Sequence, residues 1–122
     1  GRGQLGNGGT TSSSIPIQVP GLTGILAISG GIENTAALKN DGTVWDWGAN
    51  QYGQLGNGGT TESWIPVQVI GLTGVSNIET GGRHMIALKN DNKVWTWGEN
   101  YSGQLGTGTT TDSHVPVQIT GL

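Results

Sequence analysis

Apolar residues occur along this 122-residue chain in short runs, each bounded by residues that favour turns. The runs predict strands at residues 25–29, 35–39, 43–47 and 65–69. The Asn-Asp-Gly tripeptide at residues 40–42 predicts a tight hairpin between the second and third strands, because Asn and Gly tolerate the positive φ that such turns need. No stretch shows the apolar period of about 3.6 residues typical of a helix, so we expect an all-β protein.

The sequence repeats itself at intervals of fifty residues. Gly-Gln-Leu-Gly-Asn-Gly-Gly-Thr-Thr occupies residues 3–11 and 53–61, and a close variant occupies residues 103–111. Val-Trp-Asp-Trp-Gly at residues 44–48 is matched with the same spacing by Val-Trp-Thr-Trp-Gly at residues 94–98. A period near fifty residues with four strands in each unit is typical of β-propeller blades.

These units divide the chain into about two and a half repeats of 50 residues. We expect a partial blade at residues 1–24, made of a loop and an outer strand, and full blades at residues 25–74 and 75–122. Together they would form one repeat domain, an incomplete ring of four-stranded antiparallel blades and a fragment of a larger propeller. Because a terminal blade leaves one face uncovered, we expect further repeats, or further copies of the chain in a homo-oligomer, to complete the ring. Three copies would be one way to close it.

Proline and tryptophan recur at fixed places in each unit. The prolines fall in the predicted fourth strand, at Pro16, Pro66 and Pro116. Proline cannot donate a backbone hydrogen bond to a neighbouring strand, so the fourth strand is predicted to be the outermost of its blade. The tryptophans lie two residues apart on the third strand, so each pair projects from one face and is predicted to pack between adjacent blades. They are Trp45 with Trp47, and Trp95 with Trp97.

Composition narrows the possible partners. Charged residues make up 11% of the chain, the net charge is −3, and the five Lys and Arg residues are scattered. Nucleic-acid binding needs a clustered basic patch, so we expect no nucleic-acid partner. No apolar run approaches the roughly 20 residues that cross a membrane. The absence of cysteine suits either a reducing compartment or a bacterial extracytoplasmic one. A secreted or cell-surface bacterial location is favoured over a cytoplasmic one.

No motif indicates catalysis, a metal or a cofactor. The only histidines, His84 and His114, lie thirty residues apart and have no acidic partner at a ligand spacing. The Gly-x-Gly-x-x-Gly pattern at residues 1–6 lacks the strand before it and the helix after it that dinucleotide binding requires. No nucleophile elbow is present, and no carboxylate pair is placed as an acid and a base would be. We therefore expect a protein that is not an enzyme.

Three motifs, which follow one another in this order within a repeat unit, give the chain a family resemblance. They are Gly-x-x-His at residues 81–84, Asp-Gly-x-Val-Trp-x-Trp-Gly-x-Asn at residues 41–50 and Gly-Gln-Leu-Gly-x-Gly at residues 53–58. Each unit resembles the regulator of chromosome condensation repeat, with Asn34 replacing the histidine in the first full unit and Met85 replacing the next residue, a threonine, in the second.

The resemblance implies a propeller that, in other members, closes with about seven blades, and it implies that His84 bonds to nearby backbone. It also implies binding of proteins, since relatives include an exchange factor for a small GTPase and a secreted inhibitor of β-lactamase. A light-sensing role, known for a plant relative, is not expected, because the tryptophan of its Gly-Trp-Arg-His-Thr motif is missing at residues 81–85.

The predicted binding surface consists of the loops that join strands one to two and three to four, because these emerge on one face of a propeller. Loop positions that differ between units are where specificity would reside. Tyr, Trp and Arg are the residues that most often anchor interfaces. The candidate partner-binding residues are Tyr52, Trp64, Arg83, Tyr101, Glu33 and His114. In the alternative interpretation, Trp64 and the tyrosines only cover the blade beneath their own loop.

The sequence therefore predicts a non-catalytic protein-binding scaffold whose partner is a protein of unknown identity. The alternative is a purely structural or self-assembling repeat segment with no partner of its own.

Overall fold

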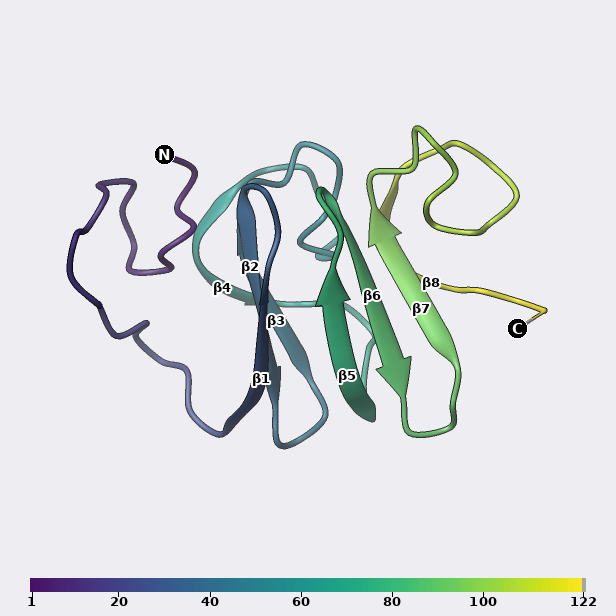
Figure 1. The fold of residues 1–122 in the computed structure, drawn as a ribbon, viewed down its shortest axis with the longest axis horizontal. Helices are drawn as coiled ribbons and strands as arrows, with labels where there is room; N and C mark the ends of the chain where they lie inside the picture. The colour runs from purple at the N-terminus through teal and green to yellow at the C-terminus, as the bar shows by residue number, and fades with distance from the viewer. Residues whose placement is uncertain (122) are drawn as a thin grey trace.

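A computed structural model describes residues 1–121 and contains two four-stranded antiparallel sheets (Figure 1). Each sheet is a meander in which neighbouring strands follow one another in the chain, in the orders β1-β2-β3-β4 and β5-β6-β7-β8. The prediction of an all-β protein built from propeller blades is confirmed, and the two blades do not close into a ring. The strands of the first sheet are β1 Ile25–Gly30, β2 Asn34–Lys39, β3 Val44–Gly48 and β4 Ser63–Gln68. Those of the second are β5 Val75–Thr80, β6 His84–Lys89, β7 Val94–Gly98 and β8 Ser113–Gln118.

The inner hairpins follow from local turn chemistry. Between β2 and β3, Gly42 adopts a φ of 80°, the left-handed region in which glycine carries no steric cost. At the equivalent turn of the second blade, Asn92 adopts a φ of 66°, which asparagine tolerates better than most residues. Both hairpins keep the same register, with Thr35 opposite Trp47 and Met85 opposite Trp97.

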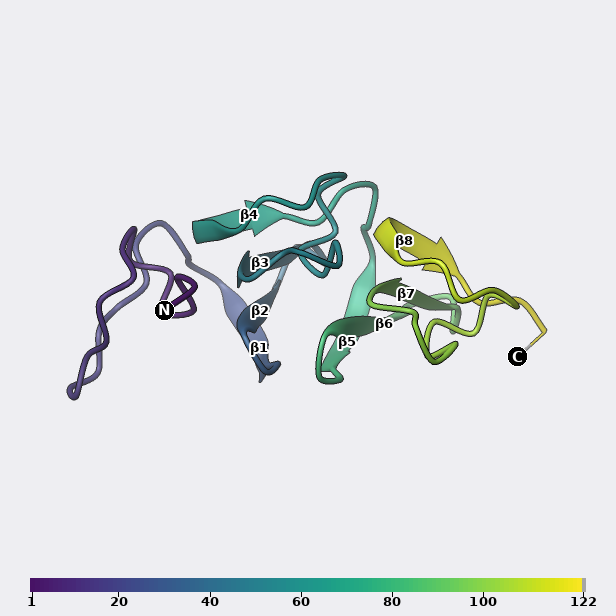
Figure 2. The ribbon, with the colours of Figure 1, turned by 90° about the horizontal axis from the view of Figure 1, so that it is seen from above.

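The proline-bearing strands lie at the outer edge of each blade, as predicted. β4 pairs only with β3, and β8 pairs only with β7. In the view from above, β4 and β8 lie on the outer side of the two sheets and β1 and β5 on the inner side (Figure 2). An edge strand has one unpaired side, so a residue without an N–H is accommodated there.

The outer strand expected at residues 15–19 is not formed in the structure. Its repeat equivalents, β4 and β8, are each held by the third strand of their own blade. Residues 1–24 contain no such third strand, and an unpaired strand has no ladder of hydrogen bonds to stabilise it. The segment runs as an extended coil beside the first sheet (Figure 2).

The hydrophobic core lies between the two blades. Ala36, Leu38 and Val44 of the first sheet are each at most 1% exposed. They belong to one buried cluster with Val75, Ile78, Met85, Ala87 and Trp97 of the second sheet and with Val69 and Leu72 of the connecting segment. Neither sheet has a core of its own, so the blades are stabilised mainly by stacking on each other.

Hydrogen bonds reinforce this stack along its length. The hydroxyls of Ser29 and Thr80 lie 2.9 Å apart, and the Ile32 N–H donates to the Gly82 carbonyl at 2.9 Å. Near the lower turns the Val75 N–H donates to the Gly42 carbonyl at 3.0 Å. The two blades are therefore joined by apolar packing in the middle and by polar contacts on either side of it.

The tryptophan pairs divide into two roles. Trp47 and Trp97 are 3% and 0% exposed and lie against the loop of the preceding repeat. Trp45 and Trp95 are half-buried, and each lies 5.5 Å from a lysine ammonium above its ring, from Lys39 and Lys89 respectively. Residues fifty apart thus occupy equivalent surroundings.

The buried indoles fasten each loop to the blade that follows it. Trp47 Nε1 donates to the Gln4 carbonyl at 2.7 Å, and Trp97 Nε1 donates to the Gln54 carbonyl at 3.0 Å. Gly6 and Gly56, next in each loop, adopt positive φ and lie so close to these rings that a Cβ would collide with the indole. The repeated Gly-Gln-Leu-Gly segment is therefore a clamp between successive repeats.

Candidate functional site

The long connections between the third and fourth strands are folded around a buried asparagine. The Asn50 carboxamide donates to the carbonyls of Gly59 and Thr61 and accepts the N–H of Leu55. Asn100 makes the same three contacts in the second blade, with Thr109, Thr111 and Leu105. These bonds give each glycine-rich loop one conformation without a strand or helix inside it.

The loops that join first to second and third to fourth strands emerge on one side of both sheets, at the top of Figure 1. We call this surface the upper loop face; it comprises residues 31–33, 49–62, 81–83 and 99–112 together with the N-terminal loop at residues 1–11. The predicted common face is therefore present, and most of the candidate residues lie on or beside it.

Two candidate residues meet across the blade boundary. The Arg83 guanidinium, from the loop between β5 and β6, lies 5.4 Å from the centre of the Tyr52 ring, from the loop after β3. Both side chains are half-buried, and Arg83 Nε is buried without a hydrogen-bond partner. A cation over an aromatic face is stabilising by about 0.5–1 kcal/mol at such a site. Because Nε is enclosed by the chain, an acceptor on a partner would have to meet the terminal nitrogens of the guanidinium.

The equivalent contact one repeat earlier is ionic. Arg2 takes the place of Tyr52 and Glu33 takes the place of Arg83 in the repeat, and Arg2 Nε lies 4.0 Å from Glu33 Oε1. Arg2 Nη1 is also 3.9 Å from Glu62 Oε2. These ion pairs join an exposed arginine to two half-buried glutamates, are long, and contribute at most about 1 kcal/mol each. They give the upper loop face mixed charge and do not form a basic or acidic patch.

Tyr101 is the most exposed aromatic residue of the upper loop face, with 83% of its surface accessible. It follows the buried Asn100 in the second long loop, and its repeat equivalent is Gln51, which is also exposed. No hydrogen bond or aromatic contact within residues 1–121 is made by its side chain. An aromatic residue held on an ordered loop and exposed to this extent is the feature on this face best suited to insert into a partner.

Trp64 and His114 lie in strands and not in loops. Each is the second residue of an outer strand, β4 or β8, and each packs on a glycine of the preceding repeat's loop, Gly3 or Gly53. Trp64 remains 44% exposed and His114 is half-buried. These two side chains cover loops of the preceding repeat, whereas the alternative interpretation placed Trp64 over the blade beneath its own loop.

A buried polar cluster lies between the blades below the upper loop face. Asn34 donates from Nδ2 to Asp46 Oδ1 at 3.0 Å and to the Met85 sulfur at 3.4 Å. Burial raises the pKa of Asp46 well above its usual value, against the lowering effect of the Asn34 amide. Asp46 is fully buried, so it is a structural group and not a surface acid or base.

His84 occupies the place of Asn34 in the second blade. Among the hydrogen bonds of residues 1–121, none from the His84 side chain to the backbone is found; the imidazole lies over Gly81 instead. Burial lowers the pKa of His84, and Glu99 opposes this shift. Within the described residues no group of three or more His, Cys, Asp or Glu side chains gathers as a metal site would.

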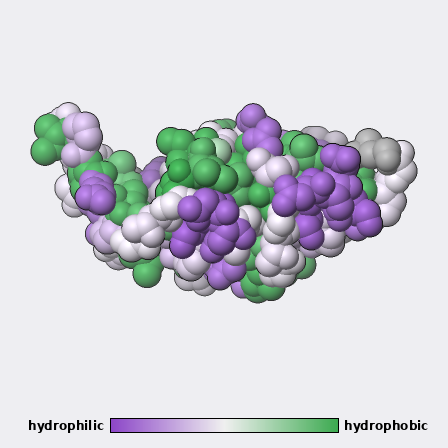
Figure 3. Space-filling model, turned by 90° about the horizontal axis from the view of Figure 1, so that it is seen from below, coloured by the Kyte–Doolittle hydropathy of each residue, from purple (hydrophilic) through white to green (hydrophobic). Residues whose placement is uncertain are grey.

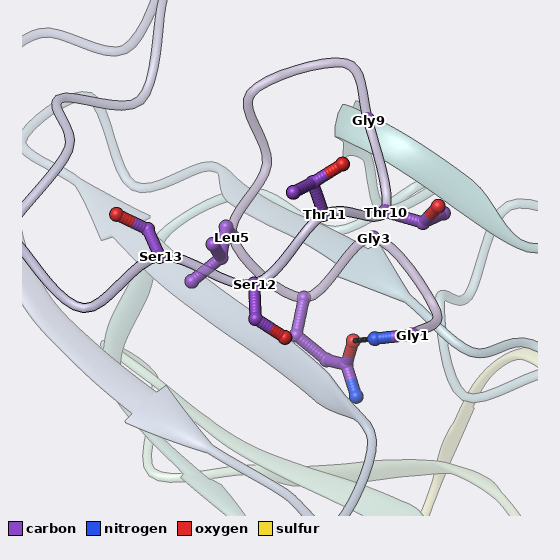
Figure 4. Close-up of a pocket in the computed structure, with 9 residues that line it drawn as sticks. Gly1, Gly3, Leu5, Gly9, Thr10, Thr11, Ser12 and Ser13 are labelled. Atoms are coloured by element: carbon purple, nitrogen blue, oxygen red, sulfur yellow. Dashed lines mark hydrogen bonds between the residues drawn. The ribbon is translucent and has the colours of Figure 1, made fainter.

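A cavity of about 320 Å³ lies at the N-terminal loop (Figure 4). It is lined by Leu5 and by residues 9–13, whose equivalents in the later repeats fold around the carboxamides of Asn50 and Asn100. Because this loop position holds a structural side chain in both later repeats, we assign no ligand to the cavity.

The lower face is different in character. Viewed from below, hydrophilic residues gather in two clusters (Figure 3), on the side where the β2–β3 and β6–β7 turns project in Figure 1. The two turns carry the repeated Lys-Asn-Asp sequence at residues 39–41 and 89–91. Because the same polar residues recur in both turns, they are repeated surface positions and not variable binding positions. No helix in the described part of the chain is long and apolar enough to cross a membrane.

The sequence analysis missed two residues that form ion pairs on the upper loop face. Arg2 bridges Glu33 and Glu62, although neither Arg2 nor Glu62 was among the predicted site residues. The alignment of repeats contained the signal, because Arg2 is equivalent to Tyr52 and lies in the same cross-blade position. It also contained the signal for Asn50 and Asn100, which recur at one position before each Gly-rich loop.

Two family models match the chain. Both describe the regulator of chromosome condensation (RCC1) repeat, one over residues 1–38, 41–88 and 91–122 and the other over residues 25–54 and 75–104. No curated protein gives a significant match.

Solved structures with the same repeat are similar in fold. Human WBSCR16 is 29% identical, with a TM-score of 0.83 over 98% of this chain and 33% of its own. Yeast RCC1 (Prp20), in its crystal structure with Kap60, is 28% identical, with a TM-score of 0.72 over 80% of this chain and 23% of its own. Prp20p from Saccharomyces cerevisiae, in a study of its binding to Gsp1p and histones, is 19% identical, with a TM-score of 0.81 over 98% of this chain and 32% of its own. The chain thus spans about a third or less of these structures, and the last likeness supports the fold alone.

Proposed function

Because the chain belongs to the RCC1 repeat family, we propose that it is a non-catalytic protein-binding scaffold that contacts its partner through the upper loop face. The family's propeller fold commonly mediates protein binding, and the similar yeast protein Prp20 was crystallised with Kap60 bound. The loops of this chain present the residue types that such contacts use.

The observation that carries the proposal is the arrangement of Tyr101, Tyr52 and Arg83 on ordered loops. Tyr101 is 83% exposed, and the Arg83 guanidinium is held over the Tyr52 ring. The two long loops that carry the tyrosines are fixed by backbone and carboxamide hydrogen bonds, so little conformational entropy is lost when they bind. An exposed aromatic residue and a positioned cation on the same face suit a partner surface that offers an apolar pocket and a carboxylate or carbonyl group.

The proposal is tested by site-specific photo-crosslinking. A photoreactive phenylalanine analogue is placed at Tyr101 on the upper loop face and, as a matched control, at Asn90 on the exposed lower turn. A protein captured from source-cell extract only from position 101 supports the proposal. Equal capture from the two positions, or none from position 101, contradicts it.

The captured protein then serves as the ligand in quantitative binding to the intact chain. Tyr101→Ala and Arg83→Ala are expected to weaken its affinity about thirtyfold each, equivalent to about 2 kcal/mol for an interface anchor. Lys93→Ala, on the lower turn, is expected to leave the affinity unchanged. Loss of binding in all three variants would indicate a general loss of folding and would refute the assignment of the face.

The packing of Trp64 and His114 favours a second candidate function. Each covers a glycine of the preceding loop, so side chains expected to contact a partner hold one repeat to the next. We propose as the alternative a structural repeat segment that assembles with further repeats or copies. Trp64→Ala distinguishes the two: a loss of assembly with partner capture intact favours the structural role, and the opposite result favours the scaffold.

A further inference from the structure

The outward side of the first blade carries an apolar groove of about 440 Å³ that no described residue fills. Its lining includes Leu5, Val19, Leu22, Ile25, Ile28 and Ala37. Ile28 is 73% exposed and Ile25 is 37% exposed, although both are strand residues of β1. Large aliphatic side chains gathered in one groove on a sheet face mark a surface that binds another apolar surface.

The second blade shows what occupies such a groove. The residues fifty positions later, Leu55, Val69, Leu72, Val75, Ile78 and Ala87, are each at most 4% exposed. All of them except Leu55 belong to one buried cluster with Ala36, Leu38 and Val44 of the first blade. The groove is therefore the repeat equivalent of the packed interface between the two blades, and it fits a sheet face of the same kind.

The chain carries such a face at its other end. Ile86, Leu88 and Val94 are the repeat equivalents of Ala36, Leu38 and Val44, and all three are aliphatic. Leu88 is 36% exposed, and Ile86 and Val94 are half-buried, whereas their equivalents in the first blade are at most 1% exposed. One molecule thus has an open groove on its first blade and an uncovered matching face on its second.

We propose that a second copy of this chain docks the β6–β7 face of its second blade into the groove on the first blade. The contact is heterologous, because the groove of one copy receives the opposite face of the next. The proposal goes beyond binding through the upper loop face and does not depend on it.

The backbone contact of the existing interface can re-form across the new one, because the Gly82 N–H of the docked copy takes the place of the Ile32 N–H and meets the Ile32 carbonyl of the receiving copy. The hydroxyl pair of Ser29 and Thr80 does not re-form, because Glu79 and Gly30 stand at the equivalent positions. Thr96 of the docked copy takes the place of Asp46 and donates to its own Leu105 carbonyl at 2.8 Å. The buried carboxylate of Asp46 therefore has no counterpart on the docked face.

Docking requires one segment to give way. Residues 101–118 of the docked copy and residues 1–18 of the receiving copy are repeat equivalents and would occupy the same place on the first blade. Residues 113–118 form a paired strand and Leu105 is fully buried, whereas residues 13–18 form no strand and Leu5 is 40% exposed. The N-terminal segment is the more weakly held, so it is the one displaced. Leu5 leaves the groove with it, and Leu105 of the docked copy is the repeat equivalent that takes its place.

The blades limit the number of copies. With two blades per copy and a head-to-tail contact, two, three or four copies give rings of four, six or eight blades, all within the usual range of about four to eight. We therefore expect a discrete species of between two and four times the 12.5 kDa chain mass when the protein is concentrated.

The test is light scattering with native mass spectrometry on the whole chain across a concentration series. Ile28→Asp charges the groove and Leu88→Asp charges the docking face, and each variant alone should be monomeric. Leu26→Asp is the matched control: Leu26 is 67% exposed on β1, but its equivalent Ser76 is exposed in the packed blade. This variant should associate as the unmodified chain does, and circular dichroism checks that every variant is folded.

A mixture of the two blocked variants gives the decisive result. Ile28→Asp retains a docking face and Leu88→Asp retains a groove, so one contact can form between them and none can extend it. We expect two monomers to combine into a dimer of one copy of each. A chain that stays monomeric at every concentration, equal effects of Ile28→Asp and Leu26→Asp, or a mixture that does not combine would each overturn the proposal.

Discussion

Replacing Trp97 with phenylalanine should weaken the joint between the blades more than the same replacement at Trp47 or Trp95. All three tryptophans lie on a third strand of a blade. The substitution removes the same atoms in each case, two carbons and the indole N–H, and keeps an aromatic ring. Differences among the three variants therefore report what each indole N–H does.

The loss of stability expected for Trp97→Phe follows from the burial of Trp97 and from its single hydrogen bond. Trp97 is fully buried, and its Nε1 donates to the Gln54 carbonyl, on a residue 1% exposed. Loss of two buried carbons costs about 1.6 kcal/mol, at roughly 0.8 kcal/mol for each. A buried carbonyl left without its donor costs a further amount of about 1–3 kcal/mol. We expect the free energy of unfolding to fall by about 3–4 kcal/mol.

The other two sites differ in what remains after the substitution. At Trp47 the Gln4 carbonyl also accepts the Thr35 hydroxyl at 3.0 Å, so Trp47→Phe leaves it partnered. The expected cost is about 2 kcal/mol, confined to the docking of the N-terminal segment. Trp95 Nε1 is buried with no acceptor, so Trp95→Phe removes an unsatisfied donor and should cost less than about 1 kcal/mol.

Urea unfolding monitored by circular dichroism measures the three values, with equal slopes required for the comparison. Amide hydrogen exchange of residues 1–20 separates local opening of the N-terminal segment from unfolding of the whole chain. Only Trp47→Phe should speed exchange in these residues while changing the urea midpoint of the whole chain little. Equal destabilisation at Trp47 and Trp97, within about 0.5 kcal/mol, or a larger loss at Trp95, would refute the assignment of the Trp97–Gln54 bond as a joint between repeats.

Three further substitutions have defined outcomes. Lys93→Thr should stabilise the chain by about 1 kcal/mol in urea unfolding, because the first blade's threonine hydroxyl accepts Trp45 Nε1 at 3.1 Å and Trp95 lacks that acceptor. Asp46→Asn should remove a pH dependence: burial raises the folded-state pKa above 3.8, so the original chain is most stable below that value and loses stability as pH rises through the folded-state pKa. Parallel stability curves for the two proteins between pH 4 and 7 would contradict this. Gly98→Ala should destabilise by about 2 kcal/mol or more, because φ is +102° and the added Cβ would lie 2.6 Å from a backbone carbonyl oxygen; Gly103→Ala, with φ +73° and open space, should cost less.

The blades could be predicted from sequence because their strands and hairpins depend on local signals. Short apolar runs bounded by turn residues, together with the Asn-Asp-Gly turn, predicted the strands to within two residues of their observed ends. The outer position of β4 also followed from a single residue type, since Pro66 cannot donate to a second neighbour.

Features that depend on a neighbouring repeat could not be predicted from one unit. Residues 15–19 match β4 in sequence, yet they form no strand because the pairing strand is missing. Trp64 has the composition of an interface anchor, but the glycine beneath its ring belongs to another repeat. The contact of Arg83 with Tyr52 likewise joins two repeats. For Trp64 and Arg83 the deciding partner lies some thirty or more residues away in the chain.

The internal repeat nevertheless records these cross-blade contacts as paired changes. Where Tyr52 replaces Arg2, its partner changes from Glu33 to Arg83, and an ion pair becomes a cation over a ring. Pairs of residues that both differ between repeats are thus explained by contact between blades. Residues that are the same in every repeat are explained by the Gly-Gln-Leu-Gly clamp and by the hydrophobic core. Tyr101 is a changed residue whose side chain makes no hydrogen bond or aromatic contact within the described part of the chain. When a side chain differs between repeats and no such contact accounts for the difference, binding to another molecule is the remaining physical reason for it. The binding proposal therefore rests on Tyr101 before Trp64.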